Sequence, residues 1–169
     1  GGGGISNAEA LTVTNSTIRG NSAASFGGGI VNTSGTTSVT NSLIAGNTAA
    51  LLGNEVRSTG TFNTNANNLF GDSSQTFADA LSGVTIEVTD ILATNDLADG
   101  TPNPNATALN AIIAPLADNG GSTQTYALVA GSPAIDAADA TALPTETDLG
   151  IDLDGDGIIE ATPISVDQR

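Results

Sequence analysis

The residues best suited to chemistry lie near the C-terminal end, where three aspartates alternate with other residues. Asp152, Asp154 and Asp156 occupy positions 1, 3 and 5 of a short run, and Gly157 occupies position 6. A glycine at position 6 lets the chain turn sharply, so the three carboxylates converge on one point, as in loops that bind Ca²⁺. We therefore predict a Ca²⁺ site here, since the ligands are hard oxygens and neither His nor Cys is present.

The remaining ligands of this site follow from the same spacing. The backbone carbonyl of Ile158 stands at position 7, and Glu160 at position 9 binds directly or through water. Position 12 is Pro163 instead of a bidentate Glu, so Asp148 or Asp167 must complete the site, and the sequence does not select between them. An acidic turn that binds nothing is the alternative, but three neighbouring carboxylates repel one another unless a cation lies between them.

The loop follows a region built from a repeat of about 26 residues. The tetrapeptide VTNS at 13–16 returns at 39–42, and the Gly-Gly-Gly-Ile run at 2–5 returns at 27–30. A fixed period of this length is typical of solenoids. The unit is rich in Thr, Val, Ile, Asn and Gly with short alternating runs, which favours strands over helices. We predict an all-β fold, a parallel β-helix (solenoid) with coils of about 25–26 residues.

Two columns of side chains follow from this period. Ile18, Ile44 and Phe70 are predicted to form an inward apolar ladder. Asn15, Asn41 and Asn67 are predicted to form a second column, in which side-chain amides hydrogen-bond along the axis. A β-propeller or a sandwich is the alternative, but neither favours a single register that carries both columns. The run at 27–29 is predicted to be a tight corner, because no Lys follows it and no helix opens there.

The chain becomes less regular after residue 72. We predict one continuous domain, the C-terminal part of a longer chain, with β-helix coils at 1–72, an irregular excursion at 73–110 and closing strands with the acidic loop at 111–169. Within these parts we expect the following elements: a helix through 77–81 capped by Ser73 or Ser74, a strand at 84–88, a loop at 96–105, and strands at 111–113 and 126–129.

Charge divides the chain sharply. Residues 1–70 are neutral overall, whereas 71–169 carry 16 carboxylates against Arg169 alone and account for the net charge of −15. Such a chain repels nucleic acid and anionic membranes, since those partners require Lys and Arg. No apolar stretch approaches the roughly 18 residues needed to cross a bilayer. We therefore predict neither nucleic-acid binding nor direct membrane insertion.

A family resemblance rests on motifs in the second half. Residues 115–128 (PLADNGGSTQTYAL), 131–137 (GSPAIDA) and 167–169 (DQR) closely resemble the signature of the choice-of-anchor Q domain, and 68–72 (NLFGD) matches its coil endings. The repeats are also similar, more weakly, to those of polymorphic outer-membrane adhesins. The resemblance implies a right-handed parallel β-helix, export and display on a bacterial surface. It implies no enzyme activity.

Two function classes remain, a non-enzymatic extracellular structural or adhesive module and a carbohydrate-active enzyme. A lyase needs a strong base, for which only Arg19, Arg57 and Arg169 are present. A hydrolase needs a pair of carboxylates on one face, for which Asp72 and Asp79 are conceivable. Because no aromatic platform for sugars is evident, we predict the non-enzymatic module, displayed outside the cell, with an unspecified polysaccharide or protein ligand.

The start of the repeat region predicts self-assembly, and three further carboxylates have predicted local roles. An open first coil is a template for another chain, so we predict that copies join end to end as a filament that Ca²⁺ stiffens. Asp118 is predicted to be a turn residue, Asp136 a backbone cap, and Glu87 an outward polar residue.

Overall fold

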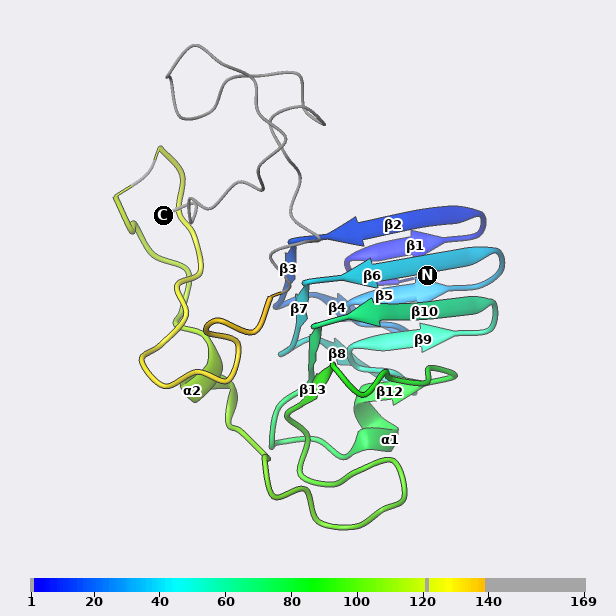
Figure 1. The fold of residues 1–169 in the computed structure, drawn as a ribbon. Coiled ribbons are helices and arrows are strands. Elements are labelled where there is room, and N and C mark those ends of the chain that lie inside the picture. Colours follow the sequence, from blue (N-terminus) through cyan, green and yellow to red (C-terminus); the bar gives the residue numbers. More distant parts are fainter. Residues whose placement is uncertain (1, 121, 139–169) are drawn as a thin grey trace, which may run out of the picture.

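The computed structural model describes residues 2–120 and 122–138. It is all-β, with about 6% helix, and its stacked coils form a parallel β-solenoid of about 3 turns (Figure 1). The fold class predicted from the repeat is therefore confirmed. The strands of the first coil are β1 (Ile5–Asn7), β2 (Ala10–Thr14), β3 (Thr17–Ile18) and β4 (Ser22–Ala23). Those of the second are β5 (Ile30–Asn32), β6 (Thr36–Thr40), β7 (Leu43–Ile44) and β8 (Thr48–Ala49). Those of the third are β9 (Val56–Ser58), β10 (Thr61–Ala66) and β11 (Leu69–Phe70).

Each strand pairs in parallel with the equivalent strand one coil away, which builds sheets along the solenoid axis. Two further strands, β12 (Leu81–Ser82) and β13 (Ile91–Leu92), follow the third coil. The sheet orders are β1-β5-β9-β12, β2-β6-β10 and β3-β7-β11-β13, and β4 pairs with β8. The register joins Ile5 to Ile30 and Ile30 to Val56, offsets of 25 and 26 residues. The coil length is therefore the one that the sequence repeat predicts.

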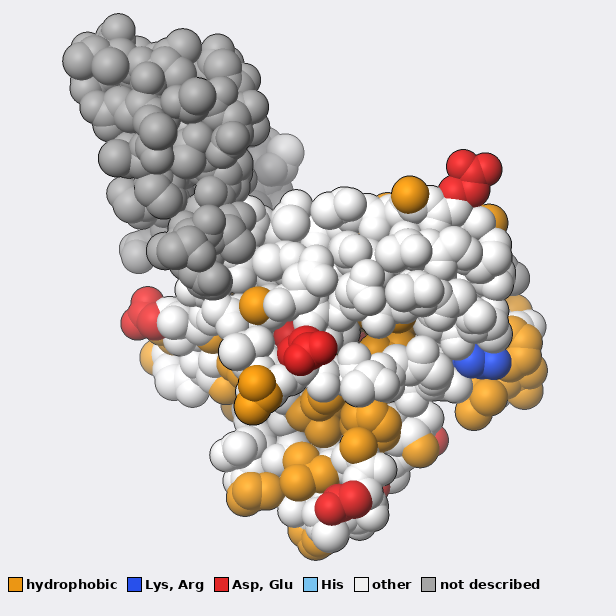
Figure 2. All heavy atoms as spheres, turned by 45° about the vertical axis from the view of Figure 1, so that its right-hand side comes forward, with side chains coloured by type: hydrophobic (Ala, Val, Ile, Leu, Met, Phe, Trp, Pro, Cys, Tyr) orange, Lys and Arg blue, Asp and Glu red, His pale blue; other side chains and the backbone are white. Residues whose placement is uncertain are grey.

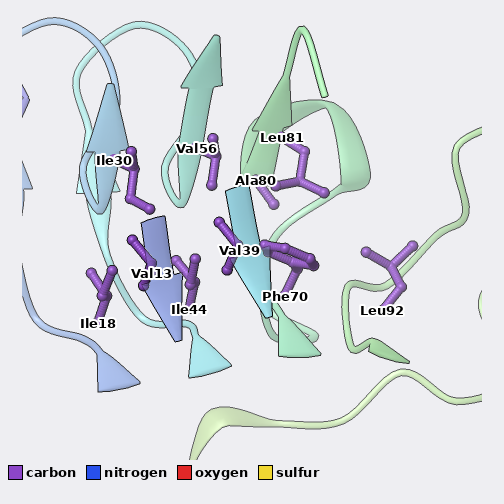
Figure 3. Packing of buried hydrophobic residues seen from close by; sticks show 10 residues of the cluster. All are labelled: Val13, Ile18, Ile30, Val39, Ile44, Val56, Phe70, Ala80, Leu81 and Leu92. Carbon is purple, nitrogen blue, oxygen red and sulfur yellow. The ribbon is translucent and has the colours of Figure 1, made fainter. Parts of the chain in front are cut away.

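The interior is an aliphatic ladder with one aromatic residue (Figure 3). Ile18 pairs with Ile44, and Ile44 with Phe70, so this predicted ladder is confirmed, and Leu92 continues it. Ile44 and Phe70 are fully buried. Burying a side chain of this size stabilises the fold by about 1.5–3 kcal/mol, so the ladder is a main source of cohesion between coils.

The asparagine column has a backbone role beside the predicted one. Asn15, Asn41 and Asn67 turn the corner between the second and third sheets with φ of 49°, 49° and 54°. Asn is among the few residues other than Gly that adopt this left-handed conformation readily. Side-chain amides also bond along the axis at the next corner, where Asn21 donates to the side-chain oxygen of Asn47 (3.0 Å). The repeated Asn is therefore explained by backbone conformation.

The glycine run is the tight corner that the sequence predicts. A Cβ on Gly28 would lie 2.4 Å from the carbonyl oxygens of both Thr48 and Asn54, where no side chain fits. Close stacking of successive coils at this corner therefore requires glycine.

The three regular coils end near residue 72, and the region expected to be irregular begins with a partial fourth coil. Its strands β12 (Leu81–Ser82) and β13 (Ile91–Leu92) pair with β9 and β11. Helix α1 (Phe77–Ala80) precedes β12 and is capped by Thr76, which exchanges hydrogen bonds with Asp79, instead of by Ser73 or Ser74.

The strand expected at 84–88 is absent from this part of the described chain. The backbone N–H of Glu87 donates to the Thr64 side chain instead of a strand carbonyl (3.0 Å), so no regular ladder forms. Glu87 itself is exposed, as predicted. The loop predicted at 96–105 is confirmed, apart from a single bridge between Asp96 and Pro102.

Residues 109–120 and 122–138, here called the flank segment, cover the outer face of the third sheet (Figure 1). The strands expected at 111–113 and 126–129 are wrong: the segment opens with helix α2 (Leu109–Ile112) and continues with isolated bridges. The reason lies in the outward side chains of Leu43 and Leu69, which pack against Ile112. Both helices have four residues, and no helix in the described residues is long and apolar enough to cross a membrane.

Candidate functional site: a cleft above a buried carboxyl network

A cleft of about 560 Å³ lies between the side of the solenoid and the start of the flank segment. We call it the flank cleft. Its polar lining includes Asn47, Asn54, Asp72, Gln75 and Asn110. The amides, hydroxyls and one carboxylate of this lining could hydrogen-bond a polar ligand, which makes the flank cleft a candidate binding site.

A buried carboxyl group lies beside these lining residues. Glu55 is fully buried, and both of its oxygens accept hydrogen bonds. Asn47 donates from its side-chain amide (2.5 Å) and from its backbone N–H (3.3 Å), and Gln75 donates from its amide (2.5 Å). Gln75 also reaches Asp72 at 3.3 Å, which links the two carboxyl groups in one network.

The position of Glu55 is explained by a side-chain ladder that ends there. The backbone N–H of Asn21 donates to the side-chain oxygen of Asn47, one coil further along (3.0 Å). The next equivalent position, 26 residues on, is Ser73 instead of Asn. The Glu55 carboxylate therefore provides the acceptor that a third Asn would have supplied to the N–H of Asn47.

A second ladder ends in the same way. The N–H of Ser16 donates to the hydroxyl of Ser42 (3.2 Å), and the N–H of Ser42 donates to the side-chain oxygen of Asn68 (3.0 Å). The N–H of Asn68 then donates to the carboxylate of Asp90 (3.0 Å). Both ladders thus terminate at a carboxylate on the C-terminal side of the stack.

Burial raises the pKa of Glu55 from 4.5 to about 7. The hydrogen bonds from Asn47 and Gln75 lower the pKa, and nearby Asp72 raises it further. Desolvation outweighs the hydrogen bonds because the side chain is removed from water. Raised carboxyl pKa values occur in general acids but also in purely structural networks.

The conceivable hydrolase pair is engaged in local backbone structure. Asp72 accepts the N–H of Ser74 (2.8 Å), and Asp79 accepts bonds from Thr76 in the capping box of α1. No buried side-chain nitrogen or oxygen in the described residues lacks a hydrogen-bond partner. These carboxylates therefore serve the irregular fourth coil, where regular ladder partners are missing.

Arg19 fastens the flank segment to the first coil. Its guanidinium donates to the carbonyls of Ala114 (2.5 Å) and Ile113 (3.4 Å), and it lies 4.9 Å from the ring centre of Tyr126. This arginine binds carbonyls and an aromatic face, which is a positioning role and not that of a base.

The predicted calcium ligands lie outside the described residues. These are Asp148, Asp152, Asp154, Asp156, Ile158 and Glu160, together with Asp167. In residues 2–120 and 122–138 no group of three or more His, Cys, Asp or Glu side chains could hold a metal ion. The calcium site therefore stays a prediction.

Two predictions concern carboxylates of the flank segment. Asp118 accepts the N–H of Gly120 at 3.0 Å, which confirms its role as a turn residue. Asp136 is exposed and has a φ of 55°, so its observed feature is a left-handed backbone conformation.

Glu55 and Asp90 were missed by sequence reasoning, although one signal was visible. At the corner where the earlier coils carry Gly-Gly-Gly, the third coil has Gly53-Asn54-Glu55. A break in a glycine run at a fixed register indicates that this corner has room for side chains, and the backbone N–H groups of Asn54 and Glu55 still donate to the carbonyls of Asp79 and Ala80.

No family model, curated protein or solved structure matches this chain.

Proposed function

We propose that this chain is a non-enzymatic structural or adhesive module of an exported bacterial surface protein. The observation that carries the proposal is that the acidic and amide side chains of the third and fourth coils hold the backbone of the stack together. Glu55 and Asp90 terminate ladders, and Asp72 and Asp79 bind backbone N–H groups of the fourth coil. A stack of coils whose backbone N–H groups are satisfied in this way is suited to act as a rigid spacer or stalk.

Surface display is supported by the resemblance of the C-terminal motifs to the choice-of-anchor Q domain. The charge distribution on the surface also supports display. Figure 2 shows acidic side chains at separate points on a broad uncharged area. Such a surface favours neutral or polar partners over nucleic acid.

Calcium is proposed to order the acidic C-terminal loop. Three Asp side chains at positions 1, 3 and 5 and a Gly at position 6 support this part of the proposal. End-to-end assembly of copies is proposed with it, because coils of 25 or 26 residues stack on one another in parallel register and copies of the chain share that register.

A carbohydrate-active enzyme is the second candidate. It is favoured by one observation, the buried Glu55 with a pKa of about 7 close to Asp72 beside a polar cleft. Carboxyl pairs with separated pKa values are a feature of acid–base catalysis. The hydrogen bonds from Asn47 and Gln75 count against it, because they already occupy both oxygens of Glu55.

The test compares stability with turnover in two variants. Asp72→Asn removes a carboxylate of the network, and Asp118→Asn removes an exposed turn carboxylate as the matched control. Under the structural proposal Asp72→Asn lowers the urea midpoint, and neither the wild type nor a variant releases sugar from polysaccharides. Turnover by the wild type that Asp72→Asn abolishes at unchanged stability would instead identify an enzyme.

Calcium and assembly need a separate measurement. Light scattering after size exclusion, in millimolar Ca²⁺ and after chelation, is expected to show a large species that dissociates on chelation. The triple variant of Asp152, Asp154 and Asp156 to Asn is the control and should not respond to Ca²⁺. A monomer under all conditions would contradict assembly but would leave the structural role intact.

A further inference from the structure

The inner lining of the flank cleft is a polar surface whose geometry is fixed. Asn47, Asp72 and Gln75 line the cleft, and all three side chains are buried. Asn47 and Gln75 donate to the enclosed carboxyl group of Glu55, and Gln75 also donates to Asp72 at 3.3 Å. These side chains are held in one orientation, so a ligand that contacts them has few groups to order on binding.

The outer lining carries polar groups with unused hydrogen-bonding capacity. The side chains of Thr48, Ser73, Ser74 and Asn110 line the cleft, and within the described residues none of the four makes a side-chain hydrogen bond. The backbone N–H groups of Ser73 and Ser74 are bound at 2.9 and 2.8 Å, which fixes where the two hydroxyls start. Each hydroxyl and the amide of Asn110 can both donate and accept.

The two charged side chains of the lining balance each other. Arg19 carries a positive formal charge and Asp72 a negative one. Arg19 uses Nη1 for the carbonyls of Ile113 and Ala114, which leaves its other N–H groups available to an acceptor. A cationic ligand would face Arg19 and an anionic ligand would face Asp72, so the lining favours a ligand without net charge.

An apolar wall completes the cleft. It consists of Ala108 and Leu109 at the start of α2, and Leu109 packs directly over the second coil, since a Cβ on Gly46 would lie 2.5 Å from its Cδ2. A sugar ring matches this mixed lining, because its edges carry hydroxyls and its faces carry C–H groups. The volume of about 560 Å³ lies within the range of about 300–1,000 Å³ found for small-molecule sites.

We propose that the flank cleft is a binding site for a neutral oligosaccharide. Hydroxyl groups of the sugar bind the side chains of Ser73, Ser74 and Asn110, and a ring face lies on Leu109. Glu55 keeps 0% of its surface exposed, so it positions Asn47 and Gln75 and does not touch the sugar. The inference rests on the proposed adhesive role and gives that role a class of ligand.

The first test presents the whole chain to an array of immobilised neutral and acidic glycans. We expect binding to neutral glycans alone and no release of sugar from them. The neutral glycan with the strongest signal is then titrated in solution by calorimetry, which gives the dissociation constant for the wild type and for each variant.

Two side-chain deletions test the site itself. Ser74→Ala and Asn110→Ala each remove an exposed group with no partner in the described protein, so the fold should keep its urea midpoint. Each should weaken glycan binding by about threefold to tenfold. The matched controls are Ser6→Ala and Asn105→Ala, which make the same deletions at exposed positions outside the cleft and should leave binding unchanged.

Three results would overturn the inference: no binding to any glycan of the array, a preference for acidic glycans, or equal binding by the cleft variants and their controls. Failure of the structural role would be seen separately. It would appear as release of sugar by the wild type or as an unchanged urea midpoint in Asp72→Asn, whether or not the array detects binding.

Discussion

The solenoid coils and the flank segment are held by different kinds of contact. In the coils, hydrogen bonds and apolar contacts join residues 25 or 26 apart and repeat along the axis. In the flank segment the described backbone hydrogen bonds join residues between 108 and 138, and attachment to the solenoid depends on one apolar cluster and on Arg19. A repeated contact spreads its stabilisation over the whole stack, whereas a local one can be lost without unfolding the rest.

The largest expected effect is the loss of a core side chain from the third coil. Phe70→Ala should reduce the free energy of unfolding by about 3–5 kcal/mol, because the ring is fully buried and no side chain can collapse into its space. Leu116→Ala, in the flank segment and 48% exposed, is the matched control and should cost less than about 1 kcal/mol. Urea unfolding measures the stability of both variants. Similar losses of stability would contradict the proposed difference between the solenoid and the flank segment.

The second effect is an unusual dependence of stability on pH. Glu55 has a folded-state pKa of about 7 against an ordinary value of 4.5, which corresponds to about 3 kcal/mol. Its contribution is complete below pH 4.5, falls as the unfolded state loses its proton, and is lost as the pH rises through 7. Glu55→Gln should therefore flatten this part of the stability profile.

The control for this prediction is Glu9→Gln, which changes an exposed carboxyl group. Its profile between pH 4.5 and 7 should follow that of the wild type. If Glu55→Gln also leaves the slope unchanged, Glu55 is not the group responsible.

A smaller effect is expected from the loss of Arg19, which joins the flank segment to the solenoid. Arg19→Ala removes hydrogen bonds to the carbonyls of Ile113 and Ala114 and the contact with Tyr126. The local loss should be about 1.5–3 kcal/mol. Hydrogen exchange should speed up in residues 109–138 and stay unchanged in β5–β9. Faster exchange throughout the solenoid would show that the regions are not independent.

The smallest effect is expected at the repeated corner. Asn15 is exposed and has a φ of 49°, so Asn15→Ala should cost about 1 kcal/mol, whereas Asn15→Gly should be nearly neutral. Thermal unfolding of the two variants measures the difference. If both variants lose stability equally, the side chain matters more than the backbone conformation.

The periodic part was predictable because its residues recur in register. The echo of Val13–Ser16 at Val39–Ser42 fixed the coil length, and the column of Ile18, Ile44 and Phe70 fixed the inward face. In a solenoid each coil packs on its neighbours in the same way, so a match between two copies reports a contact directly.

The rest could not be predicted because its structure depends on contacts that do not recur. Residues 111–113 have the propensity of a strand, yet Ile112 lies in a helix because Leu43 and Leu69 face outward and need cover. Glu55 and Asp90 lie in different sequence contexts, but each accepts the last backbone N–H of a side-chain ladder. This shared role is visible only in the three-dimensional structure. The calcium prediction falls on residues outside the described part of the chain.

The stacking of hydrogen bonds along the axis has a mechanical consequence. A pull on the end of such a stack loads the end coil first, so coils should detach one after another while the others stay folded. A coil of 26 residues adds only about 4.8 Å to the height of the stack but about 90 Å to the length of a stretched chain. A β-solenoid built this way should yield to tension by lengthening in large steps and shorten again as each coil refolds onto the next.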